Sequence, residues 1–273
     1  MRRVEGRWRW RCMMEGVDAV TRGRTALDPV EAYAAAAERF AVTVAWSDLA
    51  APVATCPGWS VRDLVIHLGN VHAWAATVVE TGAKAVEQDD RPRSGAKGRA
   101  VSAWYAGKAE DLYEVLRHTP ADRPTWNFVF GDGVASFWSR RQLHETTIHL
   151  MDLDATGSRT TEVASEVCVD GIDEVLSTWL HRMHRRHPAD LTRPVALIAS
   201  DTGDTWVLSP QGPASPPSVQ HRRTSGTAVP DRVEAPVETL YRLLWQRSAD
   251  APDVSVAGDE ERVRAFLGSR LTP

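Results

Sequence analysis

The sequence predicts an α+β protein in which an N-terminal antiparallel four-helix bundle is followed by a smaller C-terminal α+β domain. Four long segments before residue 160 show helical periodicity with no strand pattern between them, which is typical of a bundle. After residue 190 the pattern changes to short β-type runs separated by turn residues. The 273 residues suit two domains of ordinary size. We expect a disordered extension at residues 1–27, the bundle domain at residues 28–160 and the α+β domain at residues 161–273.

The first two helices have clear start signals. "DPVEAYAAAAERFAVTVAWSDL" opens with Asp28 as N-cap and Pro29 at the first helical position. "SVRDLVIHLGNVHAWAATVVETG" begins at Ser60, and Asp63 follows three residues later as its capping partner. Helices are therefore expected from both points.

Two more bundle helices and one further helix follow. The third is predicted in "VSAWYAGKAEDLYEVLRHT", after a polar loop at residues 89–97. The fourth runs from about Ala135 to Ala155 and stops at Gly157, because glycine readily ends a helix. A helix from about Glu162 to Arg186 then leads into the C-terminal domain.

The C-terminal domain is expected to mix strands and helices. "RPVALIAS" and "DTWVLSP" are two strand-like runs joined by residues 201–204, with Gly203 at the turn, which predicts a hairpin. "VQHRRTSGTAV" is interpreted as a further strand, and "APVETLYRLLWQR" and "GDEERVRAFLG" as helices.

Charge and cysteine content limit the functional classes. A net charge of −4 and a pI near 6.1 provide no basic field for nucleic acid or an anionic membrane, so neither is expected as a partner. Cys12, Cys56 and Cys168 are few and far apart, which favours a reducing compartment, the cytoplasm. No apolar run reaches the length of a membrane span. We expect a monomer or homodimer.

The segment "SRRQLHETTIHLMDLD" looks at first like the zinc-protease box, but its two histidines have the wrong spacing. His144 and His149 are five positions apart, so a helix turns them roughly 140° from each other and they cannot share a metal. Glu145 and His149 are four positions apart and lie on one face. The segment thus offers one carboxylate and one imidazole.

A third ligand is expected from the facing helix. His67 shares the apolar stripe of the second helix, whereas His72 lies on another face. In a bundle, metal ligands project from facing helices into the core, so His67, Glu145 and His149 form a candidate site. Three such ligands suit a catalytic zinc-type ion with one open position. The alternatives are a hydrogen-bonded core histidine and a solvated Glu/His pair.

The other histidines are interpreted as solvent-facing. His72 and His144 are predicted to lie on the surface, away from the metal. His181, His184 and His187 are interleaved with basic residues and are interpreted as a solvated helix end.

Two motifs, "CPGWSVRDLVIHLGNVHAW" and, some eighty residues later, "RRQLHETTIHLMDLD", resemble the mycothiol-dependent maleylpyruvate isomerase family. That family pairs a Pro-Gly-Trp-Ser/Thr-x-x-Asp-x-x-x-His entry with a His-Glu-x-x-x-His-x-x-Asp helix, on a DinB-like N-terminal metal-binding bundle. The resemblance runs from Asp28 to the C-terminus. It implies the same three metal ligands, His67, Glu145 and His149. Asp152, one turn beyond, fits a role in orienting a ligand imidazole.

The resemblance also implies a function. The protein would use a divalent metal and mycothiol, and its partners would be this thiol and a small-molecule substrate. Zinc is the expected metal, and the donor set also suits iron, nickel or manganese. The thiolate would add to a cis double bond for cis–trans isomerisation, or would be transferred to an electrophile. A non-catalytic bundle that binds a metal or small ligand, and a metal hydrolase with water as nucleophile, are the alternatives. Catalytic and cofactor-binding side chains stay unassigned.

Three further features of the sequence are weaker indications of a site. "HRRT" at residues 221–224 is a candidate for binding substrate carboxylates, with a solvated strand edge as the alternative. Trp59, Trp74 and Trp138 either line the pocket or belong to the core, and tryptophans at helical spacing favour the core. Cys56 is interpreted as a small buried apolar residue rather than a nucleophile.

Overall fold

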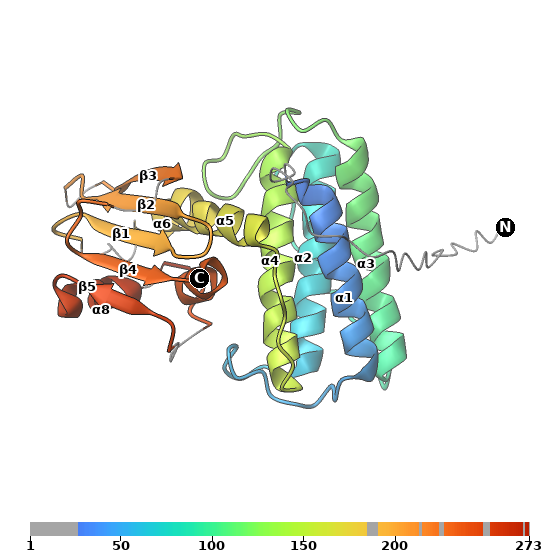
Figure 1. Ribbon diagram of the computed structural model, residues 1–273. Helices are drawn as coiled ribbons and strands as arrows, with labels where there is room; N and C mark the ends of the chain where they lie inside the picture. The colour runs from blue at the N-terminus through green and yellow to red at the C-terminus, as the bar shows by residue number, and fades with distance from the viewer. Residues whose placement is uncertain are drawn as a thin grey trace, which may run out of the picture.

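The computed structural model describes residues 27–184, 191–212, 215–223, 227–247, 252–269 and 271–272. The predicted extension at residues 1–27 lies, apart from Leu27, outside the described residues, as does His187. Figure 1 shows four long helices on one side and a sheet with shorter helices on the other. The predicted α+β fold with an N-terminal helical bundle is confirmed.

The bundle helices begin at the predicted capping residues. Asp28 accepts hydrogen bonds from the backbone N–H groups of the first turn of α1, and Ser60 and Asp63 form a capping box at the start of α2. Each cap stabilises its helix by about 1 kcal/mol. The four helices are α1 (Pro29–Trp46), α2 (Val61–Thr81), α3 (Gly98–His118) and α4 (Ser136–Thr156).

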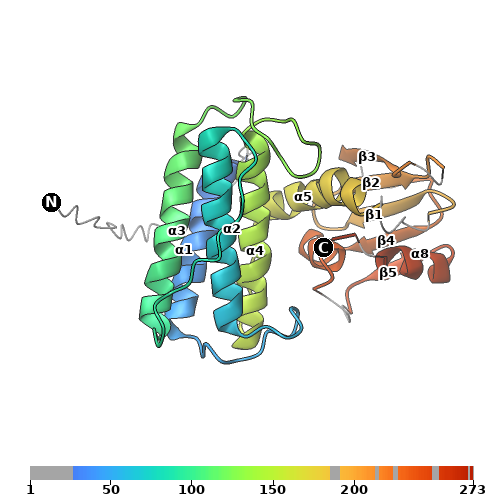
Figure 2. The ribbon, with the colours of Figure 1, turned by 180° about the vertical axis from the view of Figure 1, so that it is seen from behind.

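The segment at residues 82–97 connects α2 to α3 by returning along the bundle, as Figure 2 shows. Near its start, Trp74 Nε1 donates to the carbonyl of Ala85 at 3.0 Å. At its far end, the Arg62 guanidinium donates to the carbonyl of Ala96. Because of this return, α2 and α3 run in the same direction, whereas α2 and α4 are antiparallel. The antiparallel pair brings His67 opposite Glu145.

The C-terminal half begins with one continuous helical run and continues as a five-stranded sheet. The run consists of α5 (Ser165–Glu174), a π-helical turn η1 (Val175–Trp179) and α6 (Leu180–His184). The sheet has the order β3-β2-β1-β4-β5, and β1 and β4 are parallel. The strands are β1 (Val195–Ala199), β2 (Asp204–Ser209), β3 (Ser218–Arg223), β4 (Arg232–Ala235) and β5 (Ser255–Ala257), and the remaining helices are α7 (Val237–Leu244) and α8 (Glu260–Leu267).

The predicted hairpin is confirmed as β1 and β2, with Gly203 in the left-handed region at φ 73° in its turn. The third strand and the two last helices are confirmed too. Strands β4 and β5 were not predicted. They have four and three residues, which is too short to display an alternating pattern.

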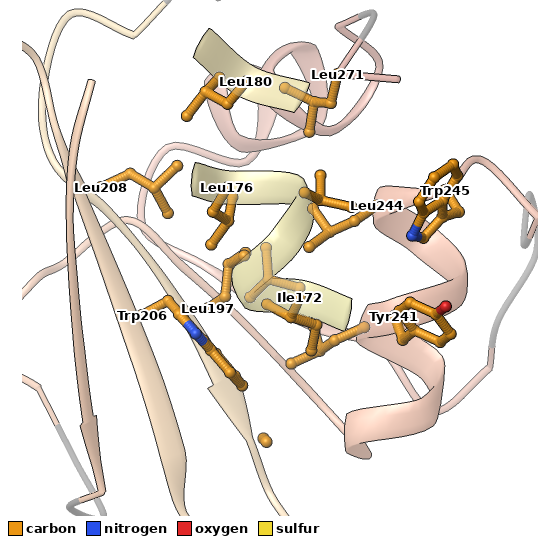
Figure 3. Packing of buried hydrophobic residues seen from close by; sticks show 14 of the residues in the cluster. Ile172, Leu176, Leu180, Leu197, Trp206, Leu208, Tyr241, Leu244, Trp245 and Leu271 are labelled. Atoms are coloured by element: carbon orange, nitrogen blue, oxygen red, sulfur yellow. The ribbon is translucent and has the colours of Figure 1, made fainter. Parts of the chain in front are cut away.

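The core of the C-terminal half lies between the sheet and two helical elements (Figure 3). Ile172 and Leu176 of the α5–α6 run face Leu197 and Trp206 of the sheet, and all four are buried. Tyr241 of α7 packs against the same run from another side. Each such apolar side chain contributes about 1.5–3 kcal/mol on burial. Within the described residues, no helix has both the length and the apolar character needed to cross a membrane.

Most of helix α4 is buried, because the bundle covers one face and the C-terminal half covers another. His144, predicted to lie on the surface, is fully buried. Its Nδ1 lies 3.1 Å from the hydroxyl oxygen of Tyr241, and its Nε2 lies 2.7 Å from the Asp170 carboxylate. His144 does lie on a different face of α4 from His149, but that face meets protein rather than water.

The surface prediction is also wrong for two other histidines. His72 is fully buried in the bundle, where its Nδ1 lies 2.8 Å from Gln142 Oε1 and its Nε2 lies 3.1 Å from the Tyr105 hydroxyl. Polar partners on α3 and α4 thus take the place of water. His184 is buried at the end of α6 rather than solvated.

Candidate metal centre

A cavity of about 460 Å³ lies where the bundle meets the C-terminal half. His67 of α2 and Glu145 of α4 line it from the bundle. Trp179 at the end of η1 and Trp245 after α7 line it from the C-terminal half. The residues that line the cavity are far apart in the sequence, so the cavity forms only when the bundle and the C-terminal half have both folded.

The three predicted ligands converge on this cavity. His67 Nε2 and His149 Nε2 each lie 3.3 Å from the same oxygen, Oε1 of Glu145. One ligand atom from each of the three residues lies within 4.8 Å of the other two. In a tetrahedral site with metal–ligand bonds of about 2.0–2.1 Å, two ligand atoms are about 3.3 Å apart. The two spacings to Glu145 Oε1 therefore match those around a small divalent ion of the zinc type, and the two imidazole nitrogens lie within 4.8 Å of each other.

Asp152 contacts the imidazole of His149 at Nδ1, the ring nitrogen that does not face Glu145. Its Oδ2 lies 2.9 Å from His149 Nδ1, which leaves Nε2 directed to Glu145. Arg247 donates to both carboxylate oxygens of Asp152, at 2.9 and 3.0 Å, and Thr55 donates from its hydroxyl at 2.6 Å. A carboxylate in this place fixes the tautomer and the orientation of a ligand histidine. Asp152 therefore stands where a residue that orients the His149 ring must stand.

The ionisation of the group follows from these contacts. Burial alone would raise the pKa of Glu145, but hydrogen bonds with His149 and His67 outweigh it and hold that pKa well below its ordinary range. Burial likewise would raise the pKa of Asp152, and contacts with His149 and Arg247 lower it instead. Both carboxylates are anionic at neutral pH, as metal ligation and orientation of a histidine require.

Cys56 is placed differently from the prediction. It is half-buried and lines the cavity, whereas the sequence predicted a small buried apolar residue. Its Sγ lies 3.6 Å from Asp152 Oδ2, so the thiol belongs to the polar group around the site. The sequence placed Cys56 at a helix entry but gave no sign that the entry loop borders the ligands.

Of the weaker candidates, one tryptophan lines the cavity and the others lie elsewhere. Trp59 lines the cavity, and its ring centroid lies 4.8 Å from that of His67. Trp74 and Trp138 belong to an aromatic cluster of the bundle core, with centroids 4.9 Å apart. Arg222 and Arg223 lie on strand β3 and do not line this cavity, so the described part of "HRRT" is not part of the candidate centre.

Two cationic residues at the site, Arg141 and Arg247, were not predicted from the sequence. Arg141 donates from Nη2 to Glu145 Oε2 at 3.1 Å, and its position four residues before Glu145 was a usable helical signal. Arg247 carried no such signal, because it lies 95 positions from Asp152.

Comparisons with known proteins relate this chain to one family model and to two solved structures. Residues 30–154 match the family model of the mycothiol maleylpyruvate isomerase N-terminal domain. A crystal structure of the mycothiol-dependent maleylpyruvate isomerase is similar over 84% of this chain and 91% of that one, with a TM-score of 0.59 at 13% identity. A histidine-to-alanine mutant of that isomerase gives a TM-score of 0.57 at 12% identity, with the same coverage.

No curated protein matches the sequence. At these identities the structural likeness establishes a shared fold, and the family match rests on the bundle that carries all three candidate ligands. Over residues 30–154, the chain therefore resembles the mycothiol maleylpyruvate isomerase N-terminal domain family.

Proposed function

We propose that this protein is a metal-dependent enzyme that uses mycothiol, either for cis–trans isomerisation of a small unsaturated acid or for thiol transfer to a small electrophile. His67, Glu145 and His149 would hold a divalent metal, with zinc favoured by the two imidazoles and one carboxylate. One observation carries the proposal: two imidazole nitrogens stand 3.3 Å from a single carboxylate oxygen at the wall of a cavity. The family match and the likeness to an isomerase support mycothiol as the thiol.

A bound divalent metal would supply a strong local positive charge, which lowers the pKa of a thiol that coordinates it. The chain's own residues orient a candidate metal ligand and limit the access of water to the cavity. Asp152 holds the ring of His149, and Arg247 holds Asp152. The aromatic rings of Trp59, Trp179 and Trp245 surround the same cavity and limit the access of water.

The nucleophile is best supplied from outside the chain. Cys168 is buried in the C-terminal core, where burial raises the pKa of its thiol. Cys56 borders the cavity, but its thiol is engaged with the Asp152 carboxylate. A cavity of about 460 Å³ leaves room for an incoming small thiol beside a substrate.

The test combines elemental analysis with a thiol-dependence assay. The purified protein should contain about one zinc or other divalent ion per chain, and should act on a panel of cis-alkenoic acids and electrophiles only when mycothiol is added. Isomerised acid without consumption of thiol would identify the isomerase, and a thioether product would identify the transferase. Equal rates with and without thiol would favour water as nucleophile. Ligand binding without any turnover would favour a carrier, and either of these last results would overturn the proposal.

A further inference from the structure

Arg141 is a buried cation in direct contact with a candidate metal ligand. It lies one helical turn before Glu145 on α4, and only 2% of it is exposed. Its Nη2 donates to Glu145 Oε2 at 3.1 Å, and its Nη1 donates to Glu174 Oε2. The rigid guanidinium fork therefore joins a carboxylate of the bundle to a buried carboxylate of the C-terminal half.

Two indole rings enclose the same guanidinium. The Arg141 Cζ lies 5.2 Å from the ring centroid of Trp179 and 5.1 Å from that of Trp245, distances typical of cation–π contacts. Glu174 immediately precedes the π-helical turn η1, and Trp179 ends it. Single π turns are rare and are found frequently at functional sites. Here the Glu174 carboxylate lies directly before the turn, and Trp179, one of the rings that fix Arg141, ends it.

The two oxygens of Glu145 consequently have different partners. Oε1 stands between His67 Nε2 and His149 Nε2, 3.3 Å from each, whereas Oε2 is held by Arg141. A carboxylate that binds a metal through both oxygens takes two coordination positions. Arginine is always charged and its planar fork holds an oxygen in a fixed direction, so Oε2 is kept away from the metal.

We infer that Arg141 is a positioning residue, which limits Glu145 to one metal-binding oxygen and so keeps a coordination position free for an incoming thiol. This inference rests on the metal site proposed above. It also gives the C-terminal half a part in the site, because Glu174, Trp179 and Trp245 hold Arg141 in place.

The variant must remove the cation without leaving a buried charge alone. Arg141→Gln by itself would strand the Glu174 carboxylate, which is 2% exposed, and could prevent folding. The double variant Arg141→Gln/Glu174→Gln removes both charges and keeps two amides able to pair. The matched control is Glu174→Gln, which retains the contact between Arg141 and Glu145.

Cobalt(II) gives the readout, because its visible absorption bands weaken when a fifth ligand joins four, and a coordinated thiolate adds a charge-transfer band. Each protein is loaded with cobalt and titrated with mycothiol. Wild type and Glu174→Gln should have the strong bands and should develop the charge-transfer band. The double variant should retain cobalt, have weaker visible bands, and bind mycothiol about 10-fold or more weakly, the size typical for loss of a group that orients a ligand.

The outcomes separate this inference from the proposed function. Identical visible bands and thiol titrations for wild type and the double variant would overturn the role of Arg141 alone. If no protein binds cobalt, the metal site and the role of Arg141 are both overturned. If wild type binds cobalt but no mycothiol, the thiol proposal is overturned, and weaker visible bands in the double variant would still support the role of Arg141.

Discussion

Asp152 and Arg247 lie 95 positions apart in the chain, and their side chains meet in a double hydrogen bond of 2.9 and 3.0 Å behind the candidate metal ligand His149. Asp152 is almost fully buried, so its negative charge depends on this partner. The contact ties the last turn of α4 to the residues that follow α7.

The first prediction concerns Asp152. Replacing it by asparagine keeps the shape but removes the charge that orients the His149 ring, so the affinity for zinc should fall by about 10- to 100-fold. Competition with a chromophoric chelator measures this affinity. Asp154→Asn is the matched control on the same helix, since Asp154 pairs with Arg159 and Thr161 and does not line the cavity. Equal losses of affinity in both variants would contradict the orienting role.

The second prediction separates ligands from buried structural histidines. His67→Ala, Glu145→Ala and His149→Ala should each lose bound metal, because each removes one of three donor atoms. His144→Ala should keep the metal and instead lose about 1–3 kcal/mol of stability, because the Asp170 and Tyr241 groups lose a buried partner. Metal content by elemental analysis and urea unfolding distinguish the two effects. Metal loss in His144→Ala would require a different ligand set.

The third prediction concerns Cys56. If the nucleophilic thiol comes from outside, Cys56→Ser should keep thiol-dependent turnover within about threefold, because serine preserves the size and replaces only a weak thiol hydrogen bond. The test is the turnover rate of the metal-loaded variant in the presence of mycothiol. Complete loss of turnover with normal metal content would instead identify Cys56 as the attacking group.

The fourth prediction is a pH dependence of stability that arises from His72. Burial lowers the pKa of His72 to about 4, against about 6.5 in an unfolded chain. Between these values the unfolded chain takes up a proton that the folded chain refuses, so stability falls as the pH falls from about 6.5 to 4, by up to about 3 kcal/mol. The neighbouring titratable groups Tyr33 and Tyr105 have raised pKa values and stay neutral in this range.

The measurement compares His72→Gln with His118→Gln by urea unfolding at pH 7.5 and 5.0, with a chelator present so that metal release does not contribute. His72→Gln should lose less stability on acidification than wild type. His118 is largely exposed, with 64% of its side chain accessible, and its variant should behave like wild type. The same acid sensitivity in all three proteins would mean that His72 is protonated in the folded state.

Much of the bundle could be predicted because its signals are local. The Asp28 cap and the Ser60/Asp63 capping box each lie within four residues of the backbone groups that they bind. The alignment of Glu145 with His149 is likewise a property of one helix. The short strands β4 and β5 could not be found this way, because their pairing partners supply most of the information that defines them.

The site could be predicted only where ligands share a helix or face one another in the bundle. His144 and His72 were placed on the surface because helical rotation tells which face a residue occupies, but not what covers that face. Arg247 approaches Asp152 from the far end of the sequence, so no spacing rule could indicate it. The position of Cys56 beside the site was missed for a related reason, because its neighbours Asp152 and Arg247 come from other elements.

The separation of Asp152 and Arg247 also sets an order of events during protein synthesis. A ribosome adds about 5–20 residues per second, so the 95 positions between them take about 5–20 s to translate. During that interval the newly made bundle already holds His67, Glu145 and His149, but the Asp152 carboxylate still lacks its arginine. Metal captured by a nascent chain at this stage would meet a loosely held His149, and the centre would become rigid only once Arg247 emerges from the ribosome.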